Sequence, residues 1–480
     1  MAVGMLGLMA CLKDAPDSLA AGKFQILEGE RPGARFGASG DWIGDFNKDG
    51  FADAVIGAPE DLQGGAGAGR AYVYYGSASD PALILQATLA GGPGDGVGVS
   101  VAGLGDVNGD GFDDFAVASR GASQLGISNE GAVFVFFGTA DGLLRAGDEK
   151  TSGVRAAGTA DVVILDDASG GTAHDLVVAS AGDLDQNGQL DLAVANPAAG
   201  RVYIFLNGSQ FPRSGRIFTS QADLTLTGEA ASDGFGSAMG AVLDVNAQDS
   251  VLKNSRFGDD FAIGAPSAQG KGAVYLILGS QGLPRGTRPV TDVASQVYRG
   301  SRSGDLFGTS IAGVGDFDGD GVDDFAIGAP GNDSGRVEIY FGQAIAGPSP
   351  LTPAVFSGES VGDRFGASVS GMLPVQFAAT PELVAGADQN DFGQTDAGAV
   401  YLMSKRLFVS DASLRGVTGS ASFADRKIRN PLSGLGPNLK MGTFVRAGLD
   451  VNGDGSGDLL AGVPGSPEGG ADTGAVLVAW

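Results

Sequence analysis

The sequence predicts an all-β protein, a seven-bladed β-propeller whose blades are four-stranded antiparallel sheets. A unit that contains an Asp-rich loop recurs seven times along the 480 residues. The segments between these loops are short, rich in Val, Ile, Tyr and Phe, and bounded by Gly, Pro, Asp and Asn, which is typical of strands. After the first dozen residues, no segment shows the apolar spacing of a helix.

Each repeat opens with a dipeptide of the Phe-Gly type, and in most repeats an Asp follows nine residues after its first member. The repeats begin at Phe36, Val97, His174, Phe235, Phe307, Phe365 and Met441. In the third repeat, His174-Asp175 replaces the dipeptide. We expect this histidine, the single one in the chain, to be a packing residue and not a catalytic base.

In each repeat the first strand follows the dipeptide, and three more strands come after it. The second strand comes directly after the Asp-rich loop and ends in a Gly-Ala-Pro-like turn, as in residues 54–59. The third strand follows a Gly and is β-branched and aromatic, as in residues 69–76 and 335–342. A weaker fourth strand ends in Leu-x-Gly or a similar sequence, as in residues 224–228.

The two ends of the sequence predict how the ring closes. Residues 474–480 form a third-strand sequence, and no fourth strand follows it. Residues 23–29 read as a fourth strand, so we expect them to complete the blade that begins near Met441. Such a clasp leaves no open sheet edge at the seam. Residues 23–480 are therefore predicted to form one propeller, and residues 1–22 a separate signal-like or lipoprotein-like segment.

The composition excludes several classes of protein. Lys and Arg number 30 against 56 Asp and Glu, and the net charge of −26 excludes a nucleic-acid binder held by a basic surface. One Cys and one His exclude a disulfide framework and metal centres built from several cysteines or histidines. A hydrophobic content of 43% excludes disorder as the main state. No apolar run is long enough for a membrane helix.

Five repeats carry a nine-residue loop with the pattern Asp-x-Asp/Asn-x-Asp/Asn-Gly-x-x-Asp. Alternate oxygen-bearing side chains in a tight loop converge on one centre, and the Gly permits the turn, so the pattern predicts a Ca²⁺ site in each loop. The predicted side-chain ligands at positions one, three, five and nine are Asp45, Asn47, Asp49 and Asp53; Asp106, Asn108, Asp110 and Asp114; Asp183, Asp185, Asn187 and Asp191; Asp316, Asp318, Asp320 and Asp324; and Asp450, Asn452, Asp454 and Asp458. Position seven is predicted to offer its backbone carbonyl, from Phe51, Phe112, Gln189, Val322 and Ser456.

The alternatives to calcium are weaker. Mg²⁺ prefers fewer protein ligands and keeps its waters. An EF-hand needs flanking helices and a Glu at position twelve, where this chain has apolar residues in a predicted strand, namely Ile56, Val117, Val194, Ile327 and Ala461. Acidic turns without metal would bring many carboxylates close together without a cation to offset their repulsion.

Two repeats depart from the pattern. The fourth keeps Asp244 and Asn246 but inserts a longer segment before Asp259 and Asp260, and the sequence leaves open whether it binds an ion. The sixth has Pro374 in place of the first Asp and Glu382 near the last ligand position, so we predict no metal there.

The linked motifs (the Phe-Gly dipeptide, the Asp loop and the Gly-Ala-Pro turn) resemble FG-GAP repeats, and the seven units together look like the N-terminal β-propeller of integrin α subunits. The resemblance covers residues 23–480. It implies Ca²⁺ at the five loops, bound between the first two strands of a blade on the face opposite the ligand surface, although integrin α propellers usually have three or four such loops. The chain lacks the leg domains, transmembrane helix and cytoplasmic tail of an integrin subunit, so we interpret it as a stand-alone bacterial version.

The leading functional hypothesis is an extracytoplasmic binding or cell-adhesion module for a protein or glycan, with no catalytic and no organic-cofactor residues. The ligand surface is expected in the loops 119–130, 159–173, 388–397 and 417–440, the last of which carries a basic group made of Arg426, Lys427, Arg429 and Lys440. The alternatives are a propeller-type hydrolase or lyase that acts on a polysaccharide or lipid-linked glycan, and a structural component of a surface assembly.

The N-terminus suggests export. Residues 8–11 (LMAC) look like a lipobox, in which Cys11 would carry a lipid anchor after cleavage. The preceding apolar stretch is short and contains no positive residue, unlike a complete signal peptide. On the strength of the lipobox-like residues we expect a secreted or surface-bound protein. The alternative is that the apolar start arose by chance.

Overall fold

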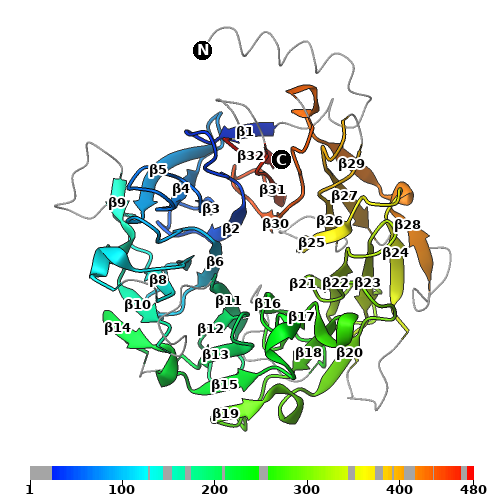
Figure 1. The fold of residues 1–480 in the computed structure, drawn as a ribbon, viewed down its shortest axis with the longest axis horizontal. Coiled ribbons are helices and arrows are strands. Elements are labelled where there is room, and N and C mark those ends of the chain that lie inside the picture. The colour runs from blue at the N-terminus through cyan, green and yellow to red at the C-terminus, as the bar shows by residue number, and fades with distance from the viewer. Residues whose placement is uncertain are drawn as a thin grey trace.

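The computed structural model describes residues 24–127, 130–143, 154–167, 175–207, 211–247, 258–343, 352–372, 382–391, 394–404, 417–435, 437–465 and 473–480. Seven sheets stand around a central axis, which confirms the predicted seven-bladed propeller (Figure 1). The first strand of each blade lies nearest the axis. Cys11 and His174 lie outside the described residues.

The first four blades run from the axis outward in chain order. Blade 1 holds β2 (Ser39–Gly44), β3 (Asp53–Ala58), β4 (Arg70–Gly76) and β5 (Leu83–Ala90). Blade 2 holds β6 (Ser100–Gly105), β7 (Asp114–Ser119), β8 (Ala132–Phe136) and β10 (Val162–Leu165). Blade 3 holds β11 (Val177–Gly182), β12 (Asp191–Asn196), β13 (Arg201–Phe205) and β15 (Leu224–Thr227). Blade 4 holds β16 (Ala238–Ala241), β17 (Phe261–Ala265), β18 (Ala273–Ile277) and β20 (Gln296–Arg299).

The last three blades complete the ring. Blade 5 holds β21 (Ser310–Gly315), β22 (Asp324–Ala329), β23 (Arg336–Tyr340) and β24 (Ala354–Ser357). Blade 6 holds β25 (Phe365–Met372), β26 (Glu382–Ala387), β27 (Ala399–Ser404) and β29 (Arg426–Arg429). Blade 7 holds β30 (Val445–Leu449), β31 (Asp458–Val463), β32 (Ala475–Ala479) and, as its outer strand, β1 (Phe24–Glu28).

Short 3₁₀ helices lie in the connections. They are η2 (Ser123–Leu125), η3 (Ala157–Thr159), η4 (Thr219–Gln221), η5 (Ala231–Asp233), η6 (Ala268–Gly270), η7 (Val290–Asp292), η9 (Ala421–Phe423) and η10 (Ser433–Leu435). Within the described ranges, no helix is long and apolar enough to cross a membrane.

The predicted clasp is confirmed. β1 pairs antiparallel with β32, from Phe24 opposite Ala479 to Glu28 opposite Ala475. The Gln25 side chain also reaches blade 1, where its Nε2 donates to the Leu83 carbonyl at 2.9 Å and its Oε1 accepts from the Leu83 N–H at 3.0 Å. The N-terminal strand therefore closes the last blade and ties it to the first.

Each blade holds the four predicted antiparallel strands, and in four blades the outer strand also pairs in parallel with a fifth. These fifth strands are β9 (Val154–Ala156), β14 (Gly215–Phe218), β19 (Gly286–Pro289) and β28 (Thr418–Ser420). Each lies in the chain just before the fourth strand of the following blade. The connection from third to fourth strand thus first runs along the neighbouring blade and covers its open edge.

This topology also corrects two predicted loops. Residues 417–440 contain β28, η9 and β29, so Arg426, Lys427 and Arg429 stand on the outer strand of blade 6 and not in a long ligand-face loop. Lys427 pairs with Glu359. Residues 159–173 likewise contain β10. The loops 119–130 and 388–397 do connect the second and third strands of their blades, as predicted.

The Phe-Gly and Gly-Ala-Pro motifs form the joints between blades. Phe36 is 1% exposed and bridges to Gly474, the glycine before β32 of the preceding blade. Gly37 has φ of 81°, and a Cβ there would lie 2.4 Å from the Ala475 carbonyl oxygen. Because only glycine fits this close approach, the dipeptide marks where each blade meets its neighbour.

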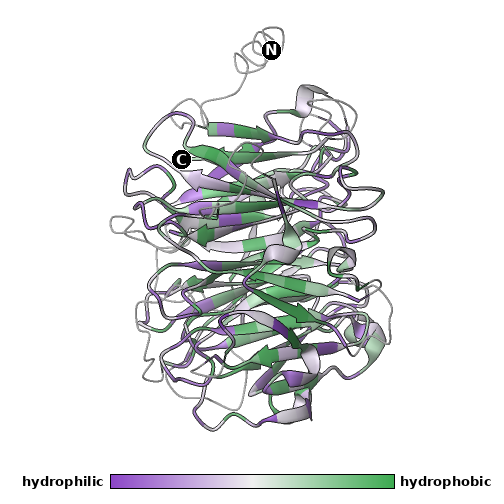
Figure 2. Cartoon of the chain, turned by 90° about the vertical axis from the view of Figure 1, so that its left-hand side faces the viewer, coloured by the Kyte–Doolittle hydropathy of each residue, from purple (hydrophilic) through white to green (hydrophobic). Residues whose placement is uncertain are grey.

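The core consists of seven apolar clusters, each shared by two neighbouring blades. The cluster between blades 1 and 2 contains Val55 and Phe115, and the one that joins blades 7 and 1 contains Trp42 and Val476. Figure 2 shows the hydrophobic strands stacked between more polar connections. Each blade therefore depends on both neighbours, and the ring must close to bury its faces.

Candidate metal centre

The five acidic loops occupy the same place in their blades, between the first strand and the second. They run from residue 45 to 53, 106 to 114, 183 to 191, 316 to 324 and 450 to 458. All five therefore open on one face of the propeller. Position twelve lies inside the second strand in each case, so strands and not EF-hand helices flank these loops.

The first Asp of each loop shapes the turn. In the first loop, one oxygen of Asp45 accepts the N–H of Asp49 and the other accepts the N–H of Gly50, both at 2.9 Å. Gly50 has φ of 95°, which is strained for any residue with a side chain. The same bond from the position-six glycine recurs at Gly111, Gly188, Gly321 and Gly455.

Positions three and five extend this winding. The Asn47 Oδ1 accepts the N–H of Asp49 at 2.9 Å, and the Asp49 Oδ1 accepts the N–H of Phe51 at 3.0 Å. These short-range bonds fold the side chains of positions three and five back onto the main chain of the loop. The spacing in the sequence is therefore expressed as a compact, oxygen-lined turn.

The Asp at position nine anchors the loop to the sheet. Asp53 is fully buried, and its two oxygens accept the N–H of Phe46 and of Gly76, each at 3.0 Å. The same pair of bonds is made by Asp114, Asp191 and Asp324. Asp458 accepts from Val451, while its buried Oδ1 has no hydrogen-bond partner. A carboxylate oxygen that accepts one N–H retains a lone pair for a cation.

Burial raises the pKa of these position-nine carboxyls, and the neighbouring loop carboxylates raise it further. The pKa reaches about 8 for Asp53, Asp114, Asp191 and Asp324, and about 7 for Asp458. The charged form is thus disfavoured in the chain alone. A cation within the loop would oppose both causes and keep the carboxylate ionised.

The oxygens present fit a hard divalent cation. Carboxylate oxygens of Asp183, Asp185 and Asp191 all lie within 4.8 Å of one another, and so do those of Asp316, Asp318 and Asp324. In the other three loops an Asn holds position three, and their three Asp carboxylates do not form such a group among the described residues. The third loop also holds two buried oxygens without a hydrogen-bond partner, Asp185 Oδ1 and Gln189 Oε1. All-oxygen ligand sets of this kind suit Ca²⁺.

The two divergent repeats differ from the five. In the fourth, Asp260 is 1% exposed and accepts the N–H groups of Val245 and Gly279, and burial raises its pKa to about 7. Asn246 Nδ2 donates to the same carboxylate. The inserted residues 248–257 lie outside the described ranges, as does Pro374 of the sixth repeat.

Neighbouring loops also contact one another. The N–H of Asp45 donates to Asp113 of blade 2 at 2.9 Å, and the N–H of Ala52 donates to the Asp450 carbonyl of blade 7 at 3.0 Å. Lys48 lies over the Phe112 ring, with its Nζ 5.0 Å from the centroid. The loops of blades 7, 1 and 2 therefore form one continuous chain of contacts.

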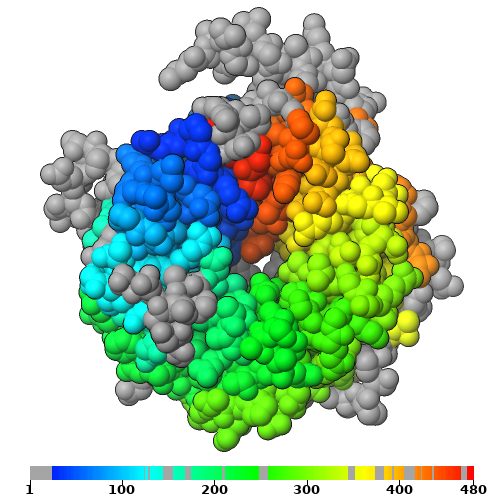
Figure 3. Space-filling view, in the orientation of Figure 1, coloured from blue at the N-terminus to red at the C-terminus, as the bar shows by residue number. Residues whose placement is uncertain are grey.

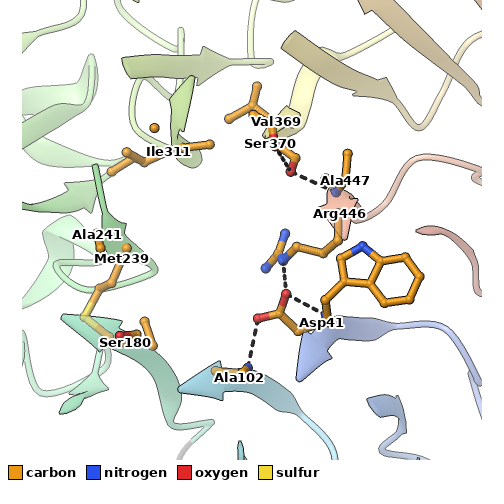
Figure 4. Close-up of a pocket in the computed structure, with 18 of the residues that line it drawn as sticks. Asp41, Ala102, Ser180, Met239, Ala241, Ile311, Val369, Ser370, Arg446 and Ala447 are labelled. Atoms are coloured by element: carbon orange, nitrogen blue, oxygen red, sulfur yellow. Dashed lines mark hydrogen bonds and ion pairs between the residues drawn. The ribbon is translucent and has the colours of Figure 1, made fainter. Parts of the chain in front are cut away.

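The sequence analysis missed a polar group in the central cavity. This cavity is about 240 Å³ and is lined by the first strands of all seven blades (Figures 3 and 4). Across the seam, Arg446 Nε donates to Asp41 Oδ1 at 2.9 Å, and Asp41 Oδ2 accepts the Gly103 N–H at 3.1 Å. A signal existed, because Asp41 and Arg446 each stand four residues before the first Asp of their loop, where first strands such as those of blades 2 and 5 hold the small residues Ala102 and Ala312.

Comparison with known proteins agrees with these repeats. The FG-GAP repeat family matches residues 36–74, 97–136, 177–205, 307–340 and 441–478, the five repeats that carry intact acidic loops. Integrin alpha-7 of Rattus norvegicus is 30% identical over 198 residues, which are 40% of this chain and 16% of that protein. Human integrin alpha-7 is 33% identical over 171 residues, 34% of this chain and 13% of that protein. Integrin alpha-3 of Cricetulus griseus is 37% identical over 123 residues, 25% and 11% of the two chains.

The aligned segment thus spans less than a fifth of each integrin subunit. The match rests on the repeats that the structure shows as blades, with their dipeptide joints and acidic loops in register. Five segments of the chain therefore match the FG-GAP repeat, and parts of its seven-bladed β-propeller are similar in sequence to integrin α subunits.

Proposed function

We propose that this propeller binds about five Ca²⁺ ions and acts outside the cytoplasm as a binding or adhesion module for a protein or glycan. The observation that carries the proposal is the uniform build of the five loops. Each places a fully buried Asp at position nine beneath a turn in which the first Asp accepts the N–H of the position-six glycine, and in two of the loops three carboxylates lie within 4.8 Å of one another. Without a cation, this arrangement brings carboxylates together at a cost in free energy.

The residues that would hold the ion are the same in each loop. Positions one, three, five and nine offer side-chain oxygens, and position seven offers its carbonyl, as with Phe51 in the first loop. Calcium would supply positive charge that offsets the negative charge of these carboxylates. The loops themselves supply the geometry, because the main-chain bonds to Asp45 and Asp53 fix the turn at both ends.

The ligand surface is proposed on the opposite face. Since the acidic loops join first to second strands, the connections from second to third and from fourth to first strands lie at the other end of each blade. Three large apolar side chains are exposed there: Leu62 is 60% exposed, Leu306 36% and Val361 86%. These side chains are positions at which a partner on this face would be contacted.

The proposed location outside the cytoplasm follows from the calcium affinity expected of these loops. Loops of modest calcium affinity fill at ~10⁻⁴–10⁻³ M, the extracellular range. The integrin resemblance supports the same location. A lipid anchor at Cys11 is part of this proposal and concerns residues outside the described ranges.

The ligand face is tested by substitution. The purified chain is screened against immobilised extracellular proteins and glycans in Ca²⁺ and in EGTA. A specific ligand should bind in Ca²⁺, and both Leu62→Asp and Val361→Asp should weaken its binding. Leu85→Asp, at a side chain 42% exposed on the outer strand of blade 1, is the matched control and should not. Turnover of a glycan without stable binding would favour the hydrolase alternative.

A further inference from the structure

The third acidic loop receives a cationic side chain from the next blade. Arg285 lies in the connection between β18 and β19, and its Nη2 is 3.5 Å from Asp185 Oδ2. Asp185 occupies position three of the loop and its side chain is 15% exposed. A guanidinium therefore already sits beside one of the predicted calcium ligands.

Asp223 holds this guanidinium in place. Arg285 Nη1 donates to Asp223 Oδ1 at 2.6 Å, and the other oxygen of Asp223 accepts the Leu206 N–H at 3.0 Å. The next residue along the chain, Gly286, donates its N–H to the Asp223 carbonyl at 2.8 Å. Asp223 thus positions both the side chain and the backbone of this segment.

The second loop shows a related contact with a different result. Arg213, from the corresponding connection of blade 3, donates to the main-chain carbonyl of Asn108. Position three of that loop is a neutral Asn, so the arginine there meets no ligand carboxylate. The pairing of an arginine with a position-three carboxylate is thus a feature of the third loop and not of every contact between a connection and a loop.

We propose that the positive charge of Arg285 opposes calcium binding at the third loop and makes this loop a low-affinity site that fills after the others. The inference rests on the proposed calcium function. Asp185 Oδ1 has no hydrogen-bond partner and remains open to a cation, while Arg285 stays on Oδ2. The bound ion and the guanidinium then repel each other across one carboxylate. Without calcium, the same arginine offsets the charge of the loop.

If the charge of Arg285 opposes calcium binding, removing it should have opposite effects on calcium affinity and on stability without calcium. Removing the charge with Arg285→Gln should tighten calcium binding at the third loop by about 3- to 10-fold, the scale expected for a partly exposed charge pair acting on a divalent ion. The same variant should lower the urea midpoint in EGTA. A purely structural arginine would instead weaken both calcium binding and stability when removed.

The test is calorimetric titration of the full chain with Ca²⁺. Asp191→Asn removes the third site and so identifies its affinity in the wild-type isotherm. Arg285→Lys keeps the charge and should leave the site weak, and Arg213→Gln should leave the third-loop affinity unchanged. In the Asp191→Asn background, Arg285→Gln should have no effect on the remaining sites. Unchanged or weaker third-loop binding in Arg285→Gln, while the other loops bind normally, would overturn the inference alone. Absence of calcium binding in every variant would refute the proposed function as well.

Discussion

Replacing Asp114 with Asn in the second loop separates two contributions to the free energy of unfolding, that of the bound metal and that of the hydrogen bonds. Asp114 is fully buried and accepts the N–H groups of Val107 at 3.0 Å and Gly138 at 2.8 Å. An amide accepts through one atom only, so one buried N–H loses its partner, which costs about 1–3 kcal/mol. Loss of a bound calcium at a hundredfold excess over Kd costs a further ~2.7 kcal/mol.

Asp95 of the same blade provides a matched control. It is 2% exposed and also accepts two main-chain N–H groups, from Gly92 and Ser123, each at 2.8 Å, but it lies outside the acidic loop. Urea unfolding is measured for both Asn variants in saturating Ca²⁺ and in EGTA. Asp95→Asn should lose the same free energy of unfolding in both buffers. Asp114→Asn should lose ~2.7 kcal/mol more in Ca²⁺ than in EGTA. Equal losses in the two buffers for Asp114→Asn would refute the assignment of this loop.

Three further predictions concern pH, the blade joints and the clasp. In EGTA the urea midpoint should fall as the pH rises from 5 to 8. The folded-state pKa values of the position-nine carboxyls, about 7 to 8, exceed their unfolded values, so the stability present at low pH is lost as these groups ionise. Saturating Ca²⁺ should remove this fall, and the same pH dependence in Ca²⁺ and in EGTA would contradict the electrostatic argument. Gly308→Val places a Cβ 2.7 Å from the Ala273 carbonyl oxygen at φ of 88°, and it should lower the free energy of unfolding by at least about 1–3 kcal/mol in either buffer. Deletion of residues 24–28 leaves β32 without its partner and should broaden or abolish the cooperative transition seen by circular dichroism, whereas a sharp wild-type transition would show that the clasp is dispensable.

The repeat pattern was sufficient to predict the propeller, the clasp and the position of the loops. Periodicity works here because every blade buries its faces in the same way, so the joints at Phe36-Gly37 and their counterparts recur in register. The acidic loops are equally local, since their turns are made by bonds within nine residues, as at Asp45 and Gly50.

Features that join different blades were not predictable in this way. The fifth strands pair with edges that are far away in the sequence, as β9 does with β5, and the short segment 154–156 carries no strong strand signal of its own. The ion pair between Asp41 and Arg446 joins two residues that are 405 positions apart in the sequence. Arg285 likewise acts on a loop in the previous blade, and only the fold shows that the two are neighbours.

Thermal unfolding with excess Ca²⁺, with excess Mg²⁺ and with EGTA, together with metal analysis of the purified protein, tests the calcium assignment most directly. About five bound ions and a large calcium-specific rise in stability, on the order of 2.7 kcal/mol per site at a hundredfold excess over Kd, are predicted. A protein with no bound metal and the same unfolding temperature in all three buffers would contradict the calcium assignment and leave only the propeller fold.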